Sequence, residues 1–222
     1  MRGKLIVFEG VEGCGKSTQI QRLRENLTQS ESFQRLQGQG MIPELLVTRE
    51  PGGTALGVGL RRLLLESQQD VAIAPRAELL LYAADRAQHM EEMILPALGA
   101  GSWVLCDRFT DSTVAYQGYG RGLDLGLIQE LNQVATAGLV PDLTIWLKLA
   151  AEQGLARAKR RGSHDRMEQA ELAFHQRVQR GFETLAQQRP ERRATLDGAP
   201  SVDAVAAEIS TVIHRYVAQW YS

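Results

Sequence analysis

One short segment constrains the fold of this chain more than any other. Residues Gly10–Ser17 read GVEGCGKS and match the pattern G-x-x-x-x-G-K-[S/T] at every fixed position. The segment follows the apolar run Leu5–Phe8 and precedes a stretch of helical periodicity. In that setting the backbone N–H groups of the loop and the helix N-terminus point at phosphate oxygens. The sequence therefore predicts a phosphate-binding loop; a plain glycine turn is the alternative interpretation.

The polar residues of the loop have separate expected roles. Lys16 would reach the outer phosphates of a nucleoside triphosphate, and the Ser17 hydroxyl would hold Mg²⁺. The residues that we expect to contact the triphosphate are Gly10, Val11, Glu12, Gly13, Cys14, Gly15, Lys16, Ser17 and Thr18.

Three further apolar runs, at Leu45–Val47, Trp103–Cys106 and Leu143–Leu147, alternate with longer stretches of helical periodicity. Their nearly continuous apolarity is typical of strands that helices bury on both faces. We therefore predict an α/β protein with the three-layer P-loop NTPase fold, a five-stranded parallel sheet flanked by helices, and a small lid. Helices are expected after Lys16, Leu56, Arg76, Asp124, Glu152, Asp165 and Val202.

Length and composition favour one domain over residues 1–222. The chain is 44% hydrophobic, enough for one substantial core, and its net charge of −1 gives no overall field for nucleic acid or an anionic membrane. Its apolar runs are too short for a signal-peptide core or a membrane span, so we expect a cytoplasmic protein. Cys14 and Cys106 suit buried or loop thiols, and the polar segment 31–40 suits an exposed extension.

Charged residues follow two of the predicted strands. Asp107 ends the run Trp103–Cys106, where it could order Mg²⁺ or its waters if that strand neighbours the phosphate loop. An acidic cap for the next turn is the alternative. Arg108 comes next, and Arg49 stands at the corresponding end of the second strand. Guanidinium groups suit a phosphate monoester, so we interpret the two arginines as a clamp for an acceptor phosphate and not as separate surface charges.

A basic segment, Arg157–Arg166, contains a Gly-Ser break between two helical stretches. Its cations would repel one another without an anion nearby, so we interpret residues 157–168 as a lid over the donor, with a solvated basic helix face as the alternative. Arg161 could then neutralise charge on the transferred group. His164 suits an exposed loop better than a catalytic base. The other histidines carry no ligand pattern: His89, His175 and His214.

In combination, these features resemble the bacterial thymidylate kinases. The loop with Glu12, the segment Thr48–Thr54 (TREPGGT), the run Leu80–Arg86 (LLYAADR), the Asp107–Arg108 pair and the basic lid occur in that order over nearly the whole chain. The resemblance implies an ATP-dependent kinase that transfers the γ-phosphate of ATP to dTMP, giving dTDP and ADP for dTTP biosynthesis. It also implies Mg²⁺ as cofactor, held by Ser17 and Asp107 directly or through water, and a homodimer formed through helices.

The resemblance assigns the acceptor site residue by residue. Glu12 would lie near the 3′-hydroxyl of the sugar, Arg49 and Arg108 would bind the phosphate of dTMP, Tyr82 would stack on thymine, and Arg86 would hydrogen-bond a base carbonyl. The complete expected dTMP site is Glu12, Arg49, Tyr82, Arg86, Arg108, Ser112, Thr113, Tyr116 and Gln117.

Within the segment that follows Arg108, the resemblance places Thr113 and Gln117 against the base, and Tyr116 where it would crowd the 2′ position and favour deoxyribose. The expected catalytic residues are Lys16, Arg108 and Arg161. Some family members carry an arginine in the phosphate loop, where this chain has glycine. Other departures are Tyr82 in place of phenylalanine, Lys148 in place of aspartate and Val58 in place of glutamate.

Three alternatives stay open at this point. A kinase for dUMP, dCMP or a deoxynucleoside would share most of these residues, because base choice depends on few of them. A regulatory GTPase or motor ATPase would leave Arg49 and Arg108 without a purpose, and the chain has no Asn-Lys-x-Asp segment. A nucleic-acid-dependent ATPase would need a basic or aromatic groove that the balanced composition does not indicate. The adenine contacts are expected from backbone groups near 197–200.

Overall fold

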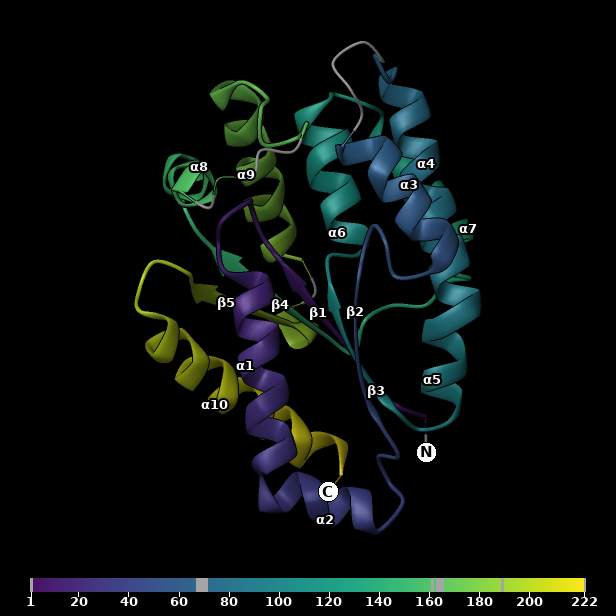
Figure 1. The fold of residues 1–222 in the computed structure, drawn as a ribbon, viewed down its shortest axis with the longest axis vertical. Helices are drawn as coiled ribbons and strands as arrows, with labels where there is room; N and C mark the ends of the chain where they lie inside the picture. The colour runs from purple at the N-terminus through teal and green to yellow at the C-terminus, as the bar shows by residue number, and fades with distance from the viewer. Residues whose placement is uncertain (1, 67–71, 161, 163–165, 189, 222) are drawn as a thin grey trace.

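A computed structural model describes the chain except for residues 1, 67–71, 161, 163–165, 189 and 222. Five parallel strands form one sheet in the order β2-β3-β1-β4-β5, with helices packed on both faces (Figure 1). This confirms the predicted α/β class and the five-stranded parallel sheet. The strands are β1 (Leu5–Glu9), β2 (Leu45–Arg49), β3 (Trp103–Asp107), β4 (Leu143–Lys148) and β5 (Arg193–Asp197).

Apart from α9, the longer helices begin close to the expected positions. The helices are α1 (Lys16–Gln29), α2 (Glu31–Gly38), α3 (Ala55–Leu65), α4 (Pro75–His89), α5 (Leu95–Gly99), α6 (Thr110–Thr113), α7 (Leu125–Ala135), α8 (Ala151–Arg160), α9 (Leu172–Ala186) and α10 (Val202–Trp220). Two π-helical segments extend α4 and α6, namely η1 (Met90–Ile94) and η2 (Val114–Gly120), and a 3₁₀ turn, η3 (Pro190–Arg192), precedes β5. None of the helices in the described part of the chain is both long and apolar enough to cross a membrane.

The order of the strands places the predicted charged residues together at the carboxyl end of the sheet. β1 lies between β3 and β4, and Phe8 pairs with Asp107. β2 lies on the other side of β3, where Arg49 also pairs with Asp107. Because all five strands are parallel, the loops after β1, β2 and β3 meet at their carboxyl ends.

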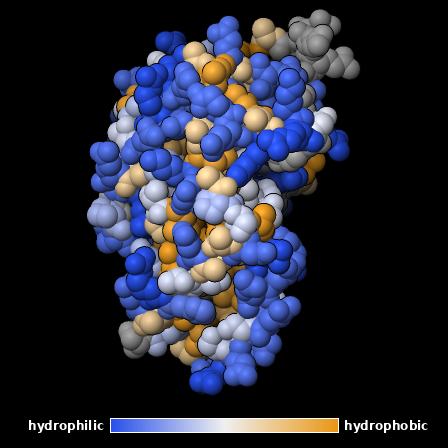
Figure 2. All heavy atoms as spheres, turned by 90° about the vertical axis from the view of Figure 1, so that its left-hand side faces the viewer, coloured by the Kyte–Doolittle hydropathy of each residue, from blue (hydrophilic) through white to orange (hydrophobic). Residues whose placement is uncertain are grey.

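The central strands are buried on both faces, as their apolar sequences predict. One core lies against α1 and α10, and a second lies against η1 and α5. The first core takes Ile6, Phe8, Trp103 and Leu105, and the second takes their neighbours Leu5, Val7, Val104 and Cys106. The side that carries α8, β5 and α10 is mostly hydrophilic at its surface, and apolar atoms are visible between the polar side chains near the middle of this face (Figure 2).

Three elements differ from the sequence-based expectation. The sequence pattern does not predict where the fifth strand lies, because β5 (RATLD) is short, partly polar and only partly buried at the edge of the sheet. Segment 31–40 is mostly exposed but forms helix α2, whose Phe33 is buried with its ring centroid 5.6 Å from that of Trp103. The helix expected just after Asp165 begins only at Leu172.

Candidate active site

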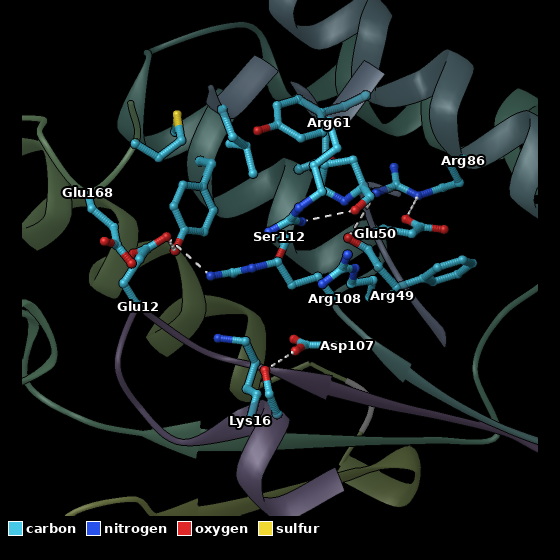
Figure 3. A pocket seen from close by; sticks show the side chains of 18 of the residues that line it. Glu12, Lys16, Arg49, Glu50, Arg61, Arg86, Asp107, Arg108, Ser112 and Glu168 are labelled. Carbon is cyan, nitrogen blue, oxygen red and sulfur yellow. Dashed lines mark hydrogen bonds and ion pairs between the residues drawn. The ribbon is translucent and has the colours of Figure 1, made fainter. Parts of the chain in front are cut away.

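A cavity opens at the carboxyl ends of β1, β2 and β3 (Figure 3). It holds about 1080 Å³ not occupied by protein atoms, the open solvent at its mouth included. The predicted residues that line it are Glu12, Gly13, Gly15, Lys16, Ser17, Thr18, Arg49, Tyr82, Arg86, Asp107, Arg108, Ser112, Thr113, Tyr116 and Gln117. Lining residues that sequence reasoning missed include Glu50, Arg61, Leu65, Phe109, Met167 and Glu168. Of the predicted loop residues, Gly10, Val11 and Cys14 are not among the lining residues.

The phosphate loop is held by close contact with the helix that leads to the lid. Gly13 has φ of 69°, a conformation that L side chains rarely adopt. A Cβ at Gly13 would lie 2.1 Å from the carbonyl oxygen of Gly154 in α8, and a Cβ at Gly154 would lie 2.3 Å from the carbonyl oxygen of Glu12. Both positions therefore require glycine, and the pair fixes the loop against α8.

Lys16 and Ser17 begin helix α1 directly under the cavity. The Lys16 Nζ donates to the carbonyl oxygens of Gly10 and Val11, each at 3.0 Å, so the ammonium group is held inside the curve of the loop. The first N–H groups of α1 have no partner within the helix and present partial positive charge to the same space. The loop thus has the donors that the triphosphate interpretation requires.

The donor set at the end of β3 fits a magnesium ion. The Ser17 hydroxyl donates to Asp107 Oδ2 at 2.8 Å, while Asp107 Oδ1 is buried and accepts no hydrogen bond from the described residues (Figure 3). A hydroxyl and a carboxylate are hard oxygen ligands, and Mg²⁺ commonly takes only one or two of them from the protein and keeps waters and phosphate oxygens. Ser17 and Asp107 could therefore hold Mg²⁺ as predicted.

Arg108 is locked in place, whereas Arg49 is not. Arg108 has φ of 71°, unusual for a non-glycine residue, and its Nη1 donates to Gly10 O and to Ser112 Oγ at 3.1 Å. Its Nη2 lies 3.2 Å from Glu12 Oε1. Arg49 is exposed, and its side chain makes no hydrogen bond or ion pair with the other described residues. Both line the cavity, so one fixed and one free guanidinium are available to an acceptor phosphate.

Glu12 is the centre of a buried polar network. Tyr116 donates its hydroxyl to Glu12 Oε1 at 2.5 Å, and His175 Nδ1 lies 3.6 Å from Glu12 Oε2, an ion-pair distance but too long for a hydrogen bond. Burial opposes ionisation of Glu12, but His175, Arg108, Lys16 and Tyr116 together lower its pKa to about 2. Glu12 is therefore a carboxylate at neutral pH. Sequence reasoning gave His175 no role, because it lies far along the chain in α9.

Arg86 is more constrained than the resemblance implies. It is 2% exposed, and three of its five N–H groups are bound by the protein. Its Nε donates to Glu50 Oε2 at 2.8 Å, its Nη1 to Asn132 Oδ1 at 2.7 Å, and its Nη2 to the carbonyl oxygen of Phe109 at 3.0 Å. Because Arg86 still lines the cavity, its remaining N–H groups are the ones open to a base carbonyl.

A second buried cluster lies behind the site and resembles a metal centre only in composition. The ligand atoms of Glu50, His89 and Cys106 lie within 4.8 Å of one another. However, the His89 nitrogens are paired with Thr48 Oγ1 at 2.7 Å and Glu50 Oε1 at 3.0 Å, and Cys106 Sγ donates to the carbonyl oxygen of Arg108. We interpret the cluster as a support for the ends of β2 and β3.

The structure describes the flanks of the predicted lid. Arg161 and His164 lie outside the described residues, so the expected catalytic role of Arg161 stays a prediction. Before them, Arg157 donates to the carbonyl oxygens of Gly198 at 2.8 Å and Ala199 at 2.9 Å, which ties α8 to the segment expected to contact adenine. After them, Arg166 donates to the carbonyl oxygen of Leu64 at 2.9 Å.

Comparisons with known proteins show which family the chain matches. A family model described as thymidylate kinase matches residues 8–209. The thymidylate kinase of Cyanothece sp. is 55% identical, with 100% of this chain and 97% of that protein covered, and the thymidylate kinase of Acaryochloris marina is 53% identical with 100% of both covered. A crystal structure of thymidylate kinase from Ehrlichia chaffeensis superposes with a TM-score of 0.75 at 31% identity, covering 96% of this chain and 100% of that one.

Proposed function

The chain belongs to the thymidylate kinase family. From this premise we propose that the enzyme transfers the γ-phosphate of ATP to dTMP within this cavity, giving dTDP and ADP for dTTP biosynthesis. The observation that carries the proposal is that one cavity is lined both by the phosphate loop and by two arginines at the carboxyl ends of β2 and β3, Arg49 and Arg108. A switch or motor ATPase needs no such acceptor site. The comparisons favour the same activity.

In this proposal the two phosphates meet between Lys16 and Arg108. Lys16 and the N-terminus of α1 bind the outer phosphates of ATP, while Arg108 and Arg49 hold the phosphate of dTMP in line with the γ-phosphate. Mg²⁺, when held by Ser17 and Asp107, would supply positive charge to the phosphate oxygens. Arg161, from the lid, would neutralise charge that develops on the transferred group.

The sugar and base of dTMP occupy the other half of the cavity. Ionised Glu12 accepts a hydrogen bond from the 3′-hydroxyl, and the ring of Tyr116, held by its bond to Glu12, leaves no room for a 2′-hydroxyl. Tyr82 stacks on thymine, Arg86 binds a base carbonyl, and Thr113 and Gln117 read the remaining edge.

We also propose that the chain forms a homodimer in the cytoplasm and that residues 157–168 close as a lid. Helices α3, α4 and α7 lie next to one another (Figure 1). They expose large apolar side chains that a second copy could cover, among them Leu56, Leu63, Leu80, Leu125 and Val134. Both cysteines are free and buried, which suits a reducing compartment.

A direct test measures ADP release from ATP and Mg²⁺ with dTMP, dUMP, dCMP and deoxythymidine as acceptors. We expect dTMP to stimulate release far above the rate without acceptor. Equal rates with and without dTMP would overturn the proposal, and preference for another acceptor would revise the base site. For the residue roles, Arg161→Ala should lower kcat far more than it raises the KM for dTMP, whereas Arg108→Ala should damage acceptor use.

A further inference from the structure

Glu78 is a buried carboxylate next to the base site for which the proposed mechanism has no use. It is 0% exposed and lies in the first turn of α4, in the row Glu78, Tyr82 and Arg86 at four-residue spacing. Residues at that spacing share one face of a helix, so Glu78 lies one turn before the stacking ring and two turns before the arginine that would bind a base carbonyl.

Three side chains donate hydrogen bonds to Glu78. Gln117 Nε2 donates to Oε1 at 2.9 Å, and Arg121 spans the carboxylate with Nε at 3.2 Å from Oε1 and Nη2 at 3.1 Å from Oε2. Arg166 Nη2 donates to Oε2 as well. Thus Oε2 binds two arginines, while Oε1 binds one arginine and the amide of Gln117.

These contacts fix which atom of the Gln117 amide faces the cavity. Burial opposes ionisation of Glu78, but the hydrogen bonds from Arg121, Gln117 and Arg166 lower its pKa, so Glu78 is ionised at neutral pH and can only accept. Gln117 must therefore turn its NH₂ group toward Glu78. Gln117 lines the cavity, and its Oε1 accepts no hydrogen bond from the described residues, which leaves that oxygen for a ligand.

We propose that Glu78 is a positioning residue for base selection: it holds the Gln117 carbonyl toward the acceptor base and so favours a pyrimidine with a hydrogen on N3. Thymine and uracil carry that hydrogen. The N3 of cytosine has no hydrogen and can only accept, so it would face the Gln117 carbonyl oxygen, which is also an acceptor. The inference rests on the proposed function, since it assumes that the base of the acceptor nucleotide lies beside Gln117.

The substitution Glu78→Gln tests this assignment because its outcome follows from the contacts. The new amide has one acceptor oxygen, and that oxygen is needed at the Oε2 position, where Arg121 and Arg166 both donate. Its NH₂ group must then face Gln117, which can avoid a clash of donors only by turning its own amide over. The cavity would then present the NH₂ group of Gln117 to the base in place of the carbonyl.

The experiment measures kcat/KM for dTMP and dCMP in the wild-type enzyme, in Glu78→Gln and in Glu92→Gln. Glu92 is the matched control, because it is exposed and accepts a hydrogen bond from Gln88 at 2.8 Å, so the same chemical change occurs in a surface Glu–Gln pair. We expect Glu78→Gln to lower the dTMP-to-dCMP ratio roughly 10- to 100-fold, mainly through KM, and Glu92→Gln to leave it unchanged.

The double variant Glu78→Gln/Gln117→Leu distinguishes positioning from general support. If Glu78 acts through Gln117, the double variant should have the same dTMP-to-dCMP ratio as Gln117→Leu alone, because the effects are not additive. If Glu78→Gln does not fold, Glu78→Asp is measured, and its retained carboxylate should keep the wild-type ratio within about threefold. A folded Glu78→Gln with the wild-type ratio, or a Glu78→Asp that loses it, would overturn the inference. A wild-type enzyme that ignores dTMP would instead refute the proposed function.

Discussion

The two ends of the central sheet bury side chains of opposite kinds. At the carboxyl ends of the strands, charged residues such as Glu9, Glu12, Glu50 and Arg86 are almost completely buried. At the amino end of β3, Trp103 is buried among aromatic rings. The difference indicates that the carboxyl end is built to bind charged ligands, while the amino end supplies stability.

The aromatic end is a closed cluster formed by three distant segments. The ring of Trp103 meets Phe33 of α2 at 5.6 Å, Trp220 of α10 at 5.4 Å and Tyr221 at 6.2 Å between centroids. Trp103 Nε1 also donates to the hydroxyl of Tyr221 at 2.8 Å, so its one polar atom is satisfied. The cluster therefore fastens α2 and the C-terminal helix to the sheet.

The polar end also buries carboxyl groups that form no ion pair with a cation among the described residues, Glu9 and Asp85. Glu9 accepts hydrogen bonds from the backbone N–H groups of Phe109 and Ser112 and from the Ser112 hydroxyl at 2.6 Å. Burial, followed by repulsion from Asp111, still raises the pKa of Glu9 to about 7. Burial, followed by repulsion from Glu50, raises the pKa of Asp85 to about 6. The site thus keeps carboxyl groups that are costly to ionise, which the aromatic end does not need.

The largest expected effect separates the two ends by activity. Lys16→Ala should lower kcat by roughly 10²–10³-fold or more, because it removes a preorganised cation from the transferring phosphates. The free energy of unfolding should change by less than about 2 kcal/mol, since the lost contacts are hydrogen bonds to two loop carbonyls and the Cys14 sulfur and one of the four interactions that lower the pKa of Glu12. Steady-state kinetics and urea unfolding measure the two quantities.

Arg24→Ala is the control for Lys16→Ala, because it removes an exposed cation from the same helix two turns later. It should leave both kcat and the unfolding free energy near the wild-type values. A Lys16→Ala enzyme that keeps most of its activity would break the contrast between the two ends.

The second prediction concerns the aromatic end, where a substitution should lower stability and leave activity nearly unchanged. Trp103→Ala should reduce the free energy of unfolding by about 3–5 kcal/mol, because a large buried ring is removed from a packed cluster. The KM values and kcat of the folded fraction should stay within about twofold of the wild type, since the site is distant. Leu172→Ala, which truncates an exposed apolar side chain, should change stability by less than about 0.5 kcal/mol. A strong loss of kcat at wild-type stability would contradict this division.

The third and smallest prediction concerns the pH dependence of stability. The pKa of Glu9 is raised in the folded state from 4.5 to about 7, so the folded protein retains a proton that the unfolded chain loses over that range. Stability should therefore fall as pH rises from about 4.5 to about 7, by up to about 3 kcal/mol from this group. Glu9→Gln should remove the contribution of Glu9 to this fall and leave the contribution of Asp85.

Urea unfolding of the wild type, Glu9→Gln and Glu91→Gln at pH 5 and pH 8 measures the effect. Glu91 is exposed, so its substitution should leave the wild-type pH dependence intact. An equal loss of unfolding free energy in the wild type and in Glu9→Gln between the two pH values would contradict the prediction that ionising buried Glu9 destabilises the folded protein.

The sequence alone determined the parts of this protein that depend on short-range pattern. The loop Gly10–Ser17, the four apolar runs and the starts of most helices follow from spacing and periodicity, because their backbone geometry is decided within a few residues. The position of β5 could not be predicted from its residues, since an edge strand with a partly polar sequence lacks the continuous apolar run that marks the central strands.

Only the tertiary structure decided which distant side chains complete each end of the sheet. The approach of His175 to Glu12, the bonds of Gln117, Arg121 and Arg166 to Glu78, and the Trp103–Tyr221 contact join residues far apart along the chain. A buried charge or ring needs a partner from whatever element packs against it, and strand order together with helix packing selects that element. The sequence thus predicted the phosphate loop and the arginines, and the fold supplied the residues that hold Arg108 and Gln117 in place.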